Sequence, residues 1–571
     1  MLPRLIGKKY PNISAIYQCV NPARNRFEKY VSASLVNLSE NQTKAYLHVE
    51  QNYQQHKQDQ KKRRTYFLPF LLTTAVSLSG LKYYLDHRAT TSCSKKVPQK
   101  LFSRQEVAKK NSKETGVWVI FGHDVYDITE FVANHPGGAN YIMLAAGKNV
   151  EPYWEMYAFH KNGEVLDILK EYHIGELRKE DWVVEESSKA GPFANDPKRH
   201  PALIANSTEP FNAETPPILA VDKLITPNDL FFVRNHLPVP NLRSKDHKLI
   251  VKGLGIKKTI VLTVDELKSK YKKVTLEAAL QCAGNRRSEM NPIKKVKGLS
   301  WSHNAISNAV WGGVLLKDVL IRAGVEPEDK NLKHIHFEGA DTDPTGAPYG
   351  ASIPANRVFN KNTPILIAYE MNGEPLPRDH GFPLRILAPG IVGARNVKWL
   401  QKIVVSDKEY PGHWQQNDYK PFSPNIDWDN VDFSKSRAIQ ELPVTSAICS
   451  PPEGSVVNEC DEEVTVKGYA YSGGGNAIVR VDVTTDGGKT WHTAKINQTD
   501  QDIYDTFSWA LWECILPIPP NHNGKMEILC RAVDSSCNTQ PETVAPIWNL
   551  RGVLNNAWHK MTLKVENDDD E

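Results

Sequence analysis

Short stretches in which apolar and polar residues alternate recur along this chain, and they predict strands rather than long helices. Residues 116–126 read GVWVIFGHDVY, which predicts a hairpin that turns at residues 122–124. The alternation returns in residues 463–471 (EVTVKGYAY) and 477–485, and residues 486–488 (DGG) then supply a turn. Short strands separated by frequent turns are typical of a sandwich of two sheets, which we expect at the C-terminal end.

Short helices are predicted instead between residues 128 and 171, at 128–133, 139–146 and 163–171. The first ends at an HPGG turn, where a proline and two glycines stop the helix and hold His135 in a fixed place. His160 follows 25 positions after His135. Two histidines on separate turns, each backed by apolar helices, can hold a flat macrocycle from both of its faces.

Residues 97–178 resemble cytochrome b5, with the HPGG turn and the second histidine in matching places. The resemblance implies that His135 and His160 are the axial ligands of a b-type haem. Iron that is held by two histidines has no free position for oxygen. We therefore expect this module to carry single electrons and to perform no chemistry of its own.

Charge is distributed unevenly along the 571 residues. The formal net charge is +4, but residues 1–96 hold 16 Lys/Arg and 5 Asp/Glu, so this leader carries +11 and the remainder −7. Because the positive charge belongs to the leader, nucleic-acid binding loses its main support from the sequence.

The leader contains one apolar run, at residues 66–81. This run is about 16 residues long and includes Pro69, so it is short for a membrane-spanning helix. A basic leader with a short apolar stop resembles the two-part mitochondrial signal that leaves a protein in the intermembrane space. A permanent single-pass anchor is the alternative. We expect a transit peptide and a mature protein that does not span the membrane.

Residues 281–287 read QCAGNRR and place a single cysteine, Cys282, close to two arginines. Positive charge favours the thiolate form, and a soft anionic sulfur is the ligand that a redox-active transition metal takes from a protein. The commoner fate of a free cysteine is burial as a small hydrophobe, and these seven residues alone leave that alternative open. The chain has eight cysteines and no CxxC pair, which argues against a disulfide scaffold or a structural zinc site.

Four further turns are rich in glycine or proline and carry polar and charged groups. They lie at residues 231–238, 339–350, 378–385 and 393–399. Each of them alone would be a solvated loop. Together with one thiolate they describe a pocket for a phosphorylated, polyanionic cofactor that is bound beside a metal.

From about Asp196 to Ala557 the chain resembles animal sulfite oxidase, through the motifs FFVRNHLP, QCAGNRRSEM, DPTGAPYGAS, MNGEPLPRDHGFP, GARNVKWL and HWQQNDYKPFSP. The resemblance implies a molybdenum cofactor in which a pterin dithiolene gives two sulfurs to the metal and Cys282 gives the third. It also implies cofactor contacts at Phe232, Val233, Arg234, Asn235, His236, Asp341, His380, Arg385, Asn396, Val397 and Lys398.

The same resemblance implies that the substrate is sulfite, which loses two electrons to become sulfate. A small dianion needs fixed cations in a partly dry pocket, and the planar fork of arginine pairs well with oxyanions. The family pattern places sulfite among Arg234, Arg287, Trp301, Tyr419 and Arg551. The electrons would then leave singly through the haem to cytochrome c. Arg286 has no partner in this interpretation.

We therefore expect a multidomain α+β protein with six regions. These are a mitochondrial leader (1–96), a cytochrome b5-like haem domain (97–178), a flexible linker (179–205), a mixed α+β molybdenum cofactor and substrate domain (206–440), an all-β immunoglobulin-like domain that forms a homodimer (441–565) and an acidic tail (566–571). Two alternatives have other signatures. A nitrate reductase-like molybdenum enzyme should carry its haem module after the molybdenum domain, and a catalytically inactive haem-binding protein should show gaps among the pocket residues.

Overall fold

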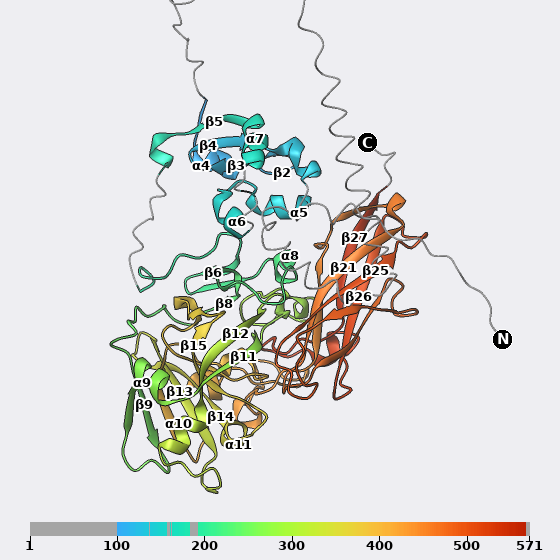
Figure 1. The fold of residues 1–571 in the computed structure, drawn as a ribbon. Helices are drawn as coiled ribbons and strands as arrows, with labels where there is room; N and C mark the ends of the chain where they lie inside the picture. Colours follow the sequence, from blue (N-terminus) through green and yellow to red (C-terminus); the bar gives the residue numbers. More distant parts are fainter. Residues whose placement is uncertain (1–99, 136–137, 157–159, 161–162, 183–191, 567–571) are drawn as a thin grey trace, which may run out of the picture. The chain divides into compact units, whose positions relative to one another are not determined.

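The computed structural model describes residues 100–135, 138–156, 160, 163–182 and 192–566 (Figure 1). The leader with its apolar run, part of the linker and the tail beyond Glu566 lie outside the described residues. The chain divides into two units, Met1–Val97 and Pro98–Glu571. Within the described residues, no helix is both long enough and apolar enough to span a membrane.

The first described domain is built on a five-stranded sheet with the strand order β1-β5-β4-β3-β2. Its strands are β1 (Leu101–Phe102), β2 (Asn111–Ser112), β3 (Gly116–Phe121), β4 (Asp124–Asp127) and β5 (His173–Leu177). β3 and β4 form the expected hairpin, in which Val119 pairs with Tyr126. Both side chains are buried and belong to the apolar cluster that fills this domain.

The helices of this domain are α4 (Arg104–Ala108), α5 (Ala139–Ile142), α6 (Glu151–Met156) and α7 (Gly163–Glu171). α7 has the predicted bounds. The helix predicted at 128–133 is instead a 3-10 helix over Thr129–Asn134, and α5 continues as a 3-10 turn over Met143–Ala145. The hydrophobic pattern does not predict α6.

The next domain contains three sheets, with the orders β10-β9-β18-β13-β14, β11-β12-β15-β16 (with β17 beside β15) and β6-β7-β8. The strands are β6 (Ile204–Thr208), β7 (Phe211–Glu214), β8 (Val233–Arg234), β9 (Lys248–Gly253), β10 (Ile260–Thr263), β11 (Lys273–Gln281), β12 (Ile306–Leu315), β13 (His334–Thr342), β14 (Pro348–Pro354), β15 (Leu366–Met371), β16 (Glu374–Pro375), β17 (Arg385–Leu387) and β18 (Leu400–Ser406). The helices are α8 (Pro217–Ala220), α9 (Val264–Lys270), α10 (Leu316–Arg322), α11 (Ala355–Val358) and α12 (His413–Gln416).

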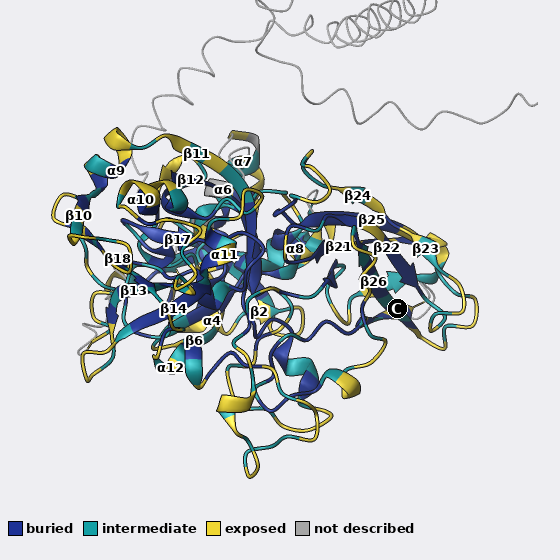
Figure 2. Cartoon of the chain, turned by 90° about the horizontal axis from the view of Figure 1, so that it is seen from below, coloured by how far each residue is buried: buried dark blue, intermediate teal, exposed yellow. Residues whose placement is uncertain are grey.

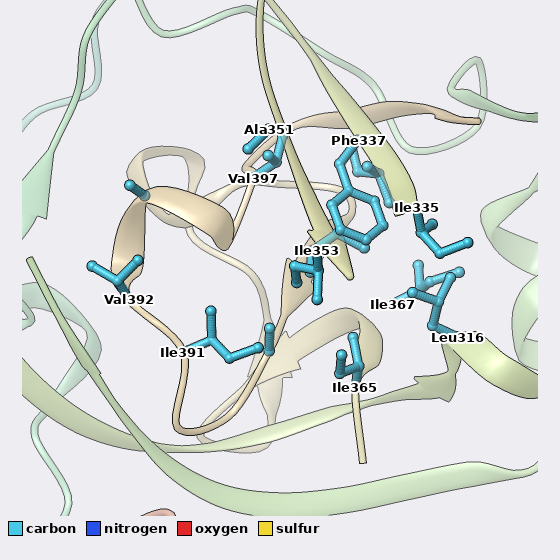
Figure 3. Packing of buried hydrophobic residues seen from close by; sticks show 14 of the residues in the cluster. Leu316, Ile335, Phe337, Ala351, Ile353, Ile365, Ile367, Ile391, Val392 and Val397 are labelled. Atoms are coloured by element: carbon cyan, nitrogen blue, oxygen red, sulfur yellow. The ribbon is translucent and has the colours of Figure 1, made fainter. Parts of the chain in front are cut away.

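Alternation along the strands builds the core of this domain. On β13, Ile335 and Phe337 are buried, while His334, His336 and Glu338, which alternate with them, are only half-buried. Figure 3 shows these two side chains among others from β14 and β15, including Ile353 and Ile367. Full burial of each such side chain stabilises the fold by about 1.5–3 kcal/mol. The loops of the candidate site therefore start from a well-packed base.

The C-terminal domain is the expected sandwich, with one sheet in the order β19-β21-β25-β24 and the other in the order β20-β27-β26-β22-β23 (Figure 1). Its strands are β19 (Thr445–Ser450), β20 (Val456–Asn458), β21 (Glu463–Tyr471), β22 (Ile478–Thr484), β23 (His492–Thr493), β24 (Lys495–Asn497), β25 (Ala510–Pro517), β26 (Lys525–Asp534) and β27 (His559–Glu566). β21 has the predicted bounds, and β22 is one residue shorter at each end than predicted. Figure 2 shows much of β21, β22 and β26 as buried, in keeping with a core between the two sheets.

Candidate active site

Two histidine rings of the first domain lie 6.1 Å apart, centre to centre, with their planes inclined by 12°. His135 and His160 line a cavity of about 170 Å³ whose other lining residues are nearly all apolar. Two metal–nitrogen bonds of about 2 Å, and about 1 Å from each nitrogen to its ring centre, give about 6 Å between ring centres. The pair therefore fits an iron atom that is held from both sides.

The orientation of His135 is fixed by its own turn. Its Nδ1–H donates a hydrogen bond to the carbonyl oxygen of Gly138 at 3.0 Å. Because Nδ1 carries the proton, Nε2 is the nitrogen that can coordinate a metal.

Cys282 follows the last residue of β11, and only 6% of it is exposed. Its N–H donates to the carbonyl of Ala305 at 2.9 Å, and its Sγ accepts a hydrogen bond from the N–H of Gly284 at 3.4 Å. A Cβ at Gly284 would lie 2.7 Å from Arg287 and 2.9 Å from Trp301, so glycine is needed for the two side chains to approach this loop. The cysteine is thus held at the wall of a pocket with its sulfur available to a ligand.

Ten of the predicted site residues line this one pocket. They come from six separate parts of the chain: Phe232, Arg234, His236, Cys282, Asp341, His380, Arg385, Asn396, Lys398 and Tyr419. Six others do not line it: Val233, Asn235, Arg287, Trp301, Val397 and Arg551. Arg234 is the second residue of the two-residue strand β8, and Phe231 lies at the end of a 3-10 helix.

Buried basic groups dominate one side of the pocket. Burial lowers the pKa of Lys398 to about 7, that of Arg385 to about 9 and that of His380 to about 3. Within the described residues, neither Lys398 nor Arg385 forms an ion pair with a carboxylate. The Lys398 ammonium instead donates to the carbonyls of Asp379 at 2.7 Å and Arg234 at 2.9 Å.

These groups fit a polyanionic cofactor. A buried cation without a counterion is costly, and a phosphate placed beside it would remove much of that cost. Asp341 is a second indication that a ligand binds here, since its Oδ1 is buried and has no hydrogen-bond partner among the described residues. Burial raises the pKa of this carboxyl to about 7, although Lys398 opposes the shift. Near pH 7 the carboxyl is partly protonated, so it can either donate a hydrogen bond to a heterocycle or accept one from it.

Arg287 and Arg551 lie beside the pocket rather than in its wall. Arg287 is buried, and it donates to the carbonyls of Gly552 at 3.0 Å and Leu299 at 3.1 Å. Burial lowers the pKa of Arg287, and the neighbouring charges of Arg234 and Arg551 lower it further. Three arginines therefore share one small region, although Arg551 belongs to the stretch that leads into β27.

Tyr419 has a strained backbone and a short hydrogen bond. Its φ of +45° lies in the left-handed region, which non-glycine residues seldom adopt. Its hydroxyl lies 2.5 Å from Nε2 of His236. Burial raises the pKa of Tyr419 to about 12, and burial together with Arg234 and Lys398 holds the pKa of His236 well below its usual value. The phenol therefore donates to a neutral imidazole.

Arg286, for which the sequence indicates no partner, is fully buried and amply bonded in the structure. Its guanidinium binds both oxygens of Glu289, at 2.8 and 2.7 Å. It also donates to the carbonyls of Ser446 at 3.1 Å, Ala557 at 2.6 Å and Trp558 at 3.3 Å. Arg286 thus joins the cysteine loop to the sandwich domain.

The structure adds residues that the sequence analysis misses. The pocket is also lined by Phe231, Leu280, Tyr349, Gly393, Ala394 and Trp399. Asp379 supports it from behind, because its carboxylate accepts a hydrogen bond from Asn235 at 2.9 Å and forms an ion pair with Arg199 at 2.8 Å. Tyr349 and Asp379 stand in motifs that already carry predicted residues, so their positions were a usable signal. The sequence contains no such signal for Arg199, because this residue lies in the predicted linker.

Three family models match separate stretches of the chain. They are the Cytochrome b5-like Heme/Steroid binding domain at residues 103–178, the Oxidoreductase molybdopterin binding domain at 236–414 and the Mo-co oxidoreductase dimerisation domain at 436–566.

Relatives match most of the chain. The sulfite oxidase of Gallus gallus is 51% identical over 459 residues, which are 80% of this chain and 99% of that protein. The mitochondrial sulfite oxidase of Homo sapiens is 48% identical over 495 residues, which are 87% of this chain and 89% of that protein. Among solved structures, the sulfane dehydrogenase SoxCD from Paracoccus pantotrophus is 27% identical, with a TM-score of 0.51 over 62% of this chain and 87% of that one.

Proposed function

This chain belongs to the sulfite oxidase family, and on that basis we propose that it oxidises sulfite to sulfate and passes the electrons singly through its haem to cytochrome c. The chain binds a molybdenum–molybdopterin cofactor and a b-type haem. The observation that supports the substrate assignment best is the convergence of Arg234, Arg287 and Arg551 around Cys282 and Tyr419.

The residues of the pocket fit the cofactor, and we assign their roles accordingly. Cys282 is the one cysteine in the pocket wall and would be the protein sulfur on molybdenum. Contacts with the pterin and its phosphate would fall on the predicted set: Phe232, Val233, Arg234, Asn235, His236, Asp341, His380, Arg385, Asn396, Val397 and Lys398. When bound, the molybdenum centre supplies the oxygen atom and accepts the two electrons of the oxidation.

The arginines would bind and orient the substrate. Sulfite is a small dianion, and Arg234, Arg287 and Arg551 present three fixed cations to it in a mostly buried region. Trp301 is fully buried beside Gly284 and helps to exclude water, which strengthens each charge interaction. Asp418 holds Arg551 in place through an ion pair. This part of catalysis is positioning and charge complementarity.

Tyr419 would hold a proton next to the reacting oxygen. Because its pKa is raised to about 12, the hydroxyl stays protonated at any physiological pH. The hydroxyl can donate a hydrogen bond either to a substrate oxygen or to Nε2 of His236, which lies 2.5 Å away. Proton movement in the site would follow this pair.

Assembly and location extend the proposal. The match to a dimerisation domain supports a homodimer, which we assign to residues 441–565. Relatives named mitochondrial support a mitochondrial location, and we propose the intermembrane space, where cytochrome c would be the acceptor. Protease treatment of mitochondria before and after rupture of the outer membrane tests this: only rupture should expose the protein. Protection that persists after rupture would place it in the matrix.

The direct test is sulfite-dependent reduction of cytochrome c by purified full-length protein whose molybdenum and haem contents have been measured. Nitrate, supplied with a reduced viologen dye as the electron donor, serves as the control substrate. We expect reduction with sulfite and no reaction with nitrate. Nitrate turnover would favour the nitrate reductase-like alternative, and a molybdenum-loaded protein that is inert towards sulfite would favour the inactive haem-binding one.

A further inference from the structure

Arg395 is a fully buried arginine that the proposed function does not use. It ends the 3-10 turn Gly393–Arg395, and the residues on either side of it, Ala394 and Asn396, line the pocket that contains Cys282. Arg395 itself does not line this pocket. Within the described residues it forms no ion pair, and its Nη2 has no hydrogen-bond partner. A buried charge that forms no ion pair with a carboxylate is costly, and the other contacts of the Arg395 guanidinium must offset this cost.

The Arg395 guanidinium joins two other segments of the chain. Its Nε donates to the carbonyl of Ile439 at 2.9 Å, and its Nη1 donates to the carbonyl of Trp414 at 3.2 Å. Trp414 belongs to α12, which ends three residues before Tyr419. The N–H of Ile439 in turn donates to the carbonyl of Tyr419 at 2.9 Å. Arg395 therefore holds the approach to Tyr419 and also the residue that binds the Tyr419 backbone.

Tyr419 is a residue that needs to be held. Its φ of +45° is unfavourable for a side chain larger than glycine, and such conformations persist only where their surroundings determine them. Its N–H is bound by Oδ1 of Asp418 at 2.8 Å, and its hydroxyl is bound by His236. The carbonyl of Tyr419 is bound by the N–H of Ile439, and Ile439 is in turn held by Arg395.

The base of this arrangement is rigid. Val392 and Val397, on either side of the turn, are fully buried members of the large apolar core (Figure 3). A Cβ at Gly393 would lie only 2.9 Å from the carbonyl oxygen of Gln281, so the turn packs directly against the backbone before Cys282. The guanidinium thus extends from a fixed turn beside Cys282 to the segment that carries Tyr419.

We infer that Arg395 is a positioning residue of the active site, whose planar guanidinium binds two carbonyls from different segments and thereby fixes the hydroxyl of Tyr419 relative to Cys282. The inference rests on the proposed function, in which Tyr419 contacts sulfite. Lysine is a point donor and does not reproduce the planar fork, so Arg395→Lys keeps the charge and loses the geometry.

A double-mutant cycle tests the inference. Arg395→Lys is compared with the parent chain in two backgrounds, the wild type and Tyr419→Phe. We expect kcat/KM for sulfite to fall by about 10- to 100-fold in the wild type, as for other misplacements of a reacting group. In the Tyr419→Phe background the same change should cost less than about threefold, because the hydroxyl that it misplaces is gone. Equal losses in both backgrounds would overturn the inference. Arg395→Met, which removes both donors, replaces the lysine variant should that one not fold.

Hydrogen exchange gives a readout that does not require activity. In the full chain, Arg395→Met should speed amide exchange in peptides covering residues 414–439 by at least about tenfold, because local opening there loses two hydrogen bonds. Ile353→Ala, a cavity in the same core (Figure 3), is the matched control: it should lower Tm and leave both this exchange and kcat/KM unchanged. Unaltered exchange in Arg395→Met would refute the contact. A wild type that does not oxidise sulfite would refute the proposed function, while the exchange result would still decide the role of Arg395.

Discussion

Two adjacent arginines show how strongly the role of a residue depends on where its guanidinium points. Arg286 adopts a φ of +64°, and its side chain binds Glu289 of its own loop and donates to three carbonyls of the sandwich domain. Arg287 lies on the other side of the same turn, within the electrostatic reach of Cys282 and Tyr419. The left-handed backbone of Arg286 sends the two arginine side chains in different directions, and the sequence does not reveal this conformation.

Arg287→Gln should raise KM for sulfite by at least about tenfold, because a charged hydrogen-bond donor to the dianion is lost, while kcat falls less. Steady-state kinetics measures both constants. Arg322→Gln, on α10, removes an arginine that packs against Tyr271 outside the site and serves as the control. An unchanged KM in Arg287→Gln would remove this residue from the substrate site.

Tyr419→Phe should lower kcat/KM without changing the shape of the pH profile. A phenol whose pKa is raised to about 12 remains protonated from pH 6 to 10, so its ionisation cannot produce an alkaline limb within that range. The loss should be about tenfold, the value of one positioned hydrogen bond. A limb in the wild type that disappears in the variant would show that Tyr419 ionises within this range.

At the scale of elements, the site is assembled from turns that strands and buried side chains hold in place. The cysteine loop follows β11, pairs with the stretch before β12 and is tied to the sandwich by Arg286. The last part of the predicted linker is also attached, since Arg199 binds Asp379 with two hydrogen bonds of 2.8 and 2.9 Å. The tether to the haem domain therefore reaches the support of the cofactor pocket.

Arg286→Met should lower the free energy of unfolding by about 3 kcal/mol or more, because it leaves buried carbonyls and Glu289 without their donor. Chemical denaturation measures this difference. Arg357→Met breaks an exposed ion pair with Glu441 and should cost less than about 1 kcal/mol. Equal losses in the two variants would mean that Arg286 does not join the domains as described.

The sequence predicts regular elements well where periodicity is clear, as at α7 and β21. It is less reliable where a segment is short or irregular: the helix predicted at 128–133 is a 3-10 helix, and the short helix α6 is not predicted at all. Site residues with distinctive chemistry in a motif could be named in advance. Supporting residues such as Arg199 and Arg395 could not, because their roles arise from contacts between segments that are distant in the sequence.

At the scale of the whole molecule, the chain joins a domain with a two-histidine cavity to a domain with a cysteine pocket. The first suits single-electron transfer, since two histidines leave no open position on the iron. The second suits a two-electron oxidation. The division explains why one chain binds two cofactors: the haem converts a two-electron event into two single steps for a one-electron acceptor.

His160→Ala should remove the haem and abolish reduction of cytochrome c by sulfite, with the molybdenum content unchanged. Absorbance spectra and metal analysis report the two cofactors separately. His123→Ala is the matched control, because His123 stacks on Trp182 and does not line the haem cavity. Full cytochrome c reduction by haem-free protein would show that electrons leave by another route.

The most direct test of the account is anaerobic mixing of the oxidised holoenzyme with sulfite while the haem absorbance is followed. We predict that sulfite reduces the haem of the wild type. In Cys282→Ser the haem should stay oxidised with sulfite and still be reduced by dithionite, because only the path through the metal that Cys282 is proposed to bind is lost. A molybdenum-loaded wild type whose haem remains oxidised, or a Cys282→Ser variant reduced at the wild-type rate, would contradict the account.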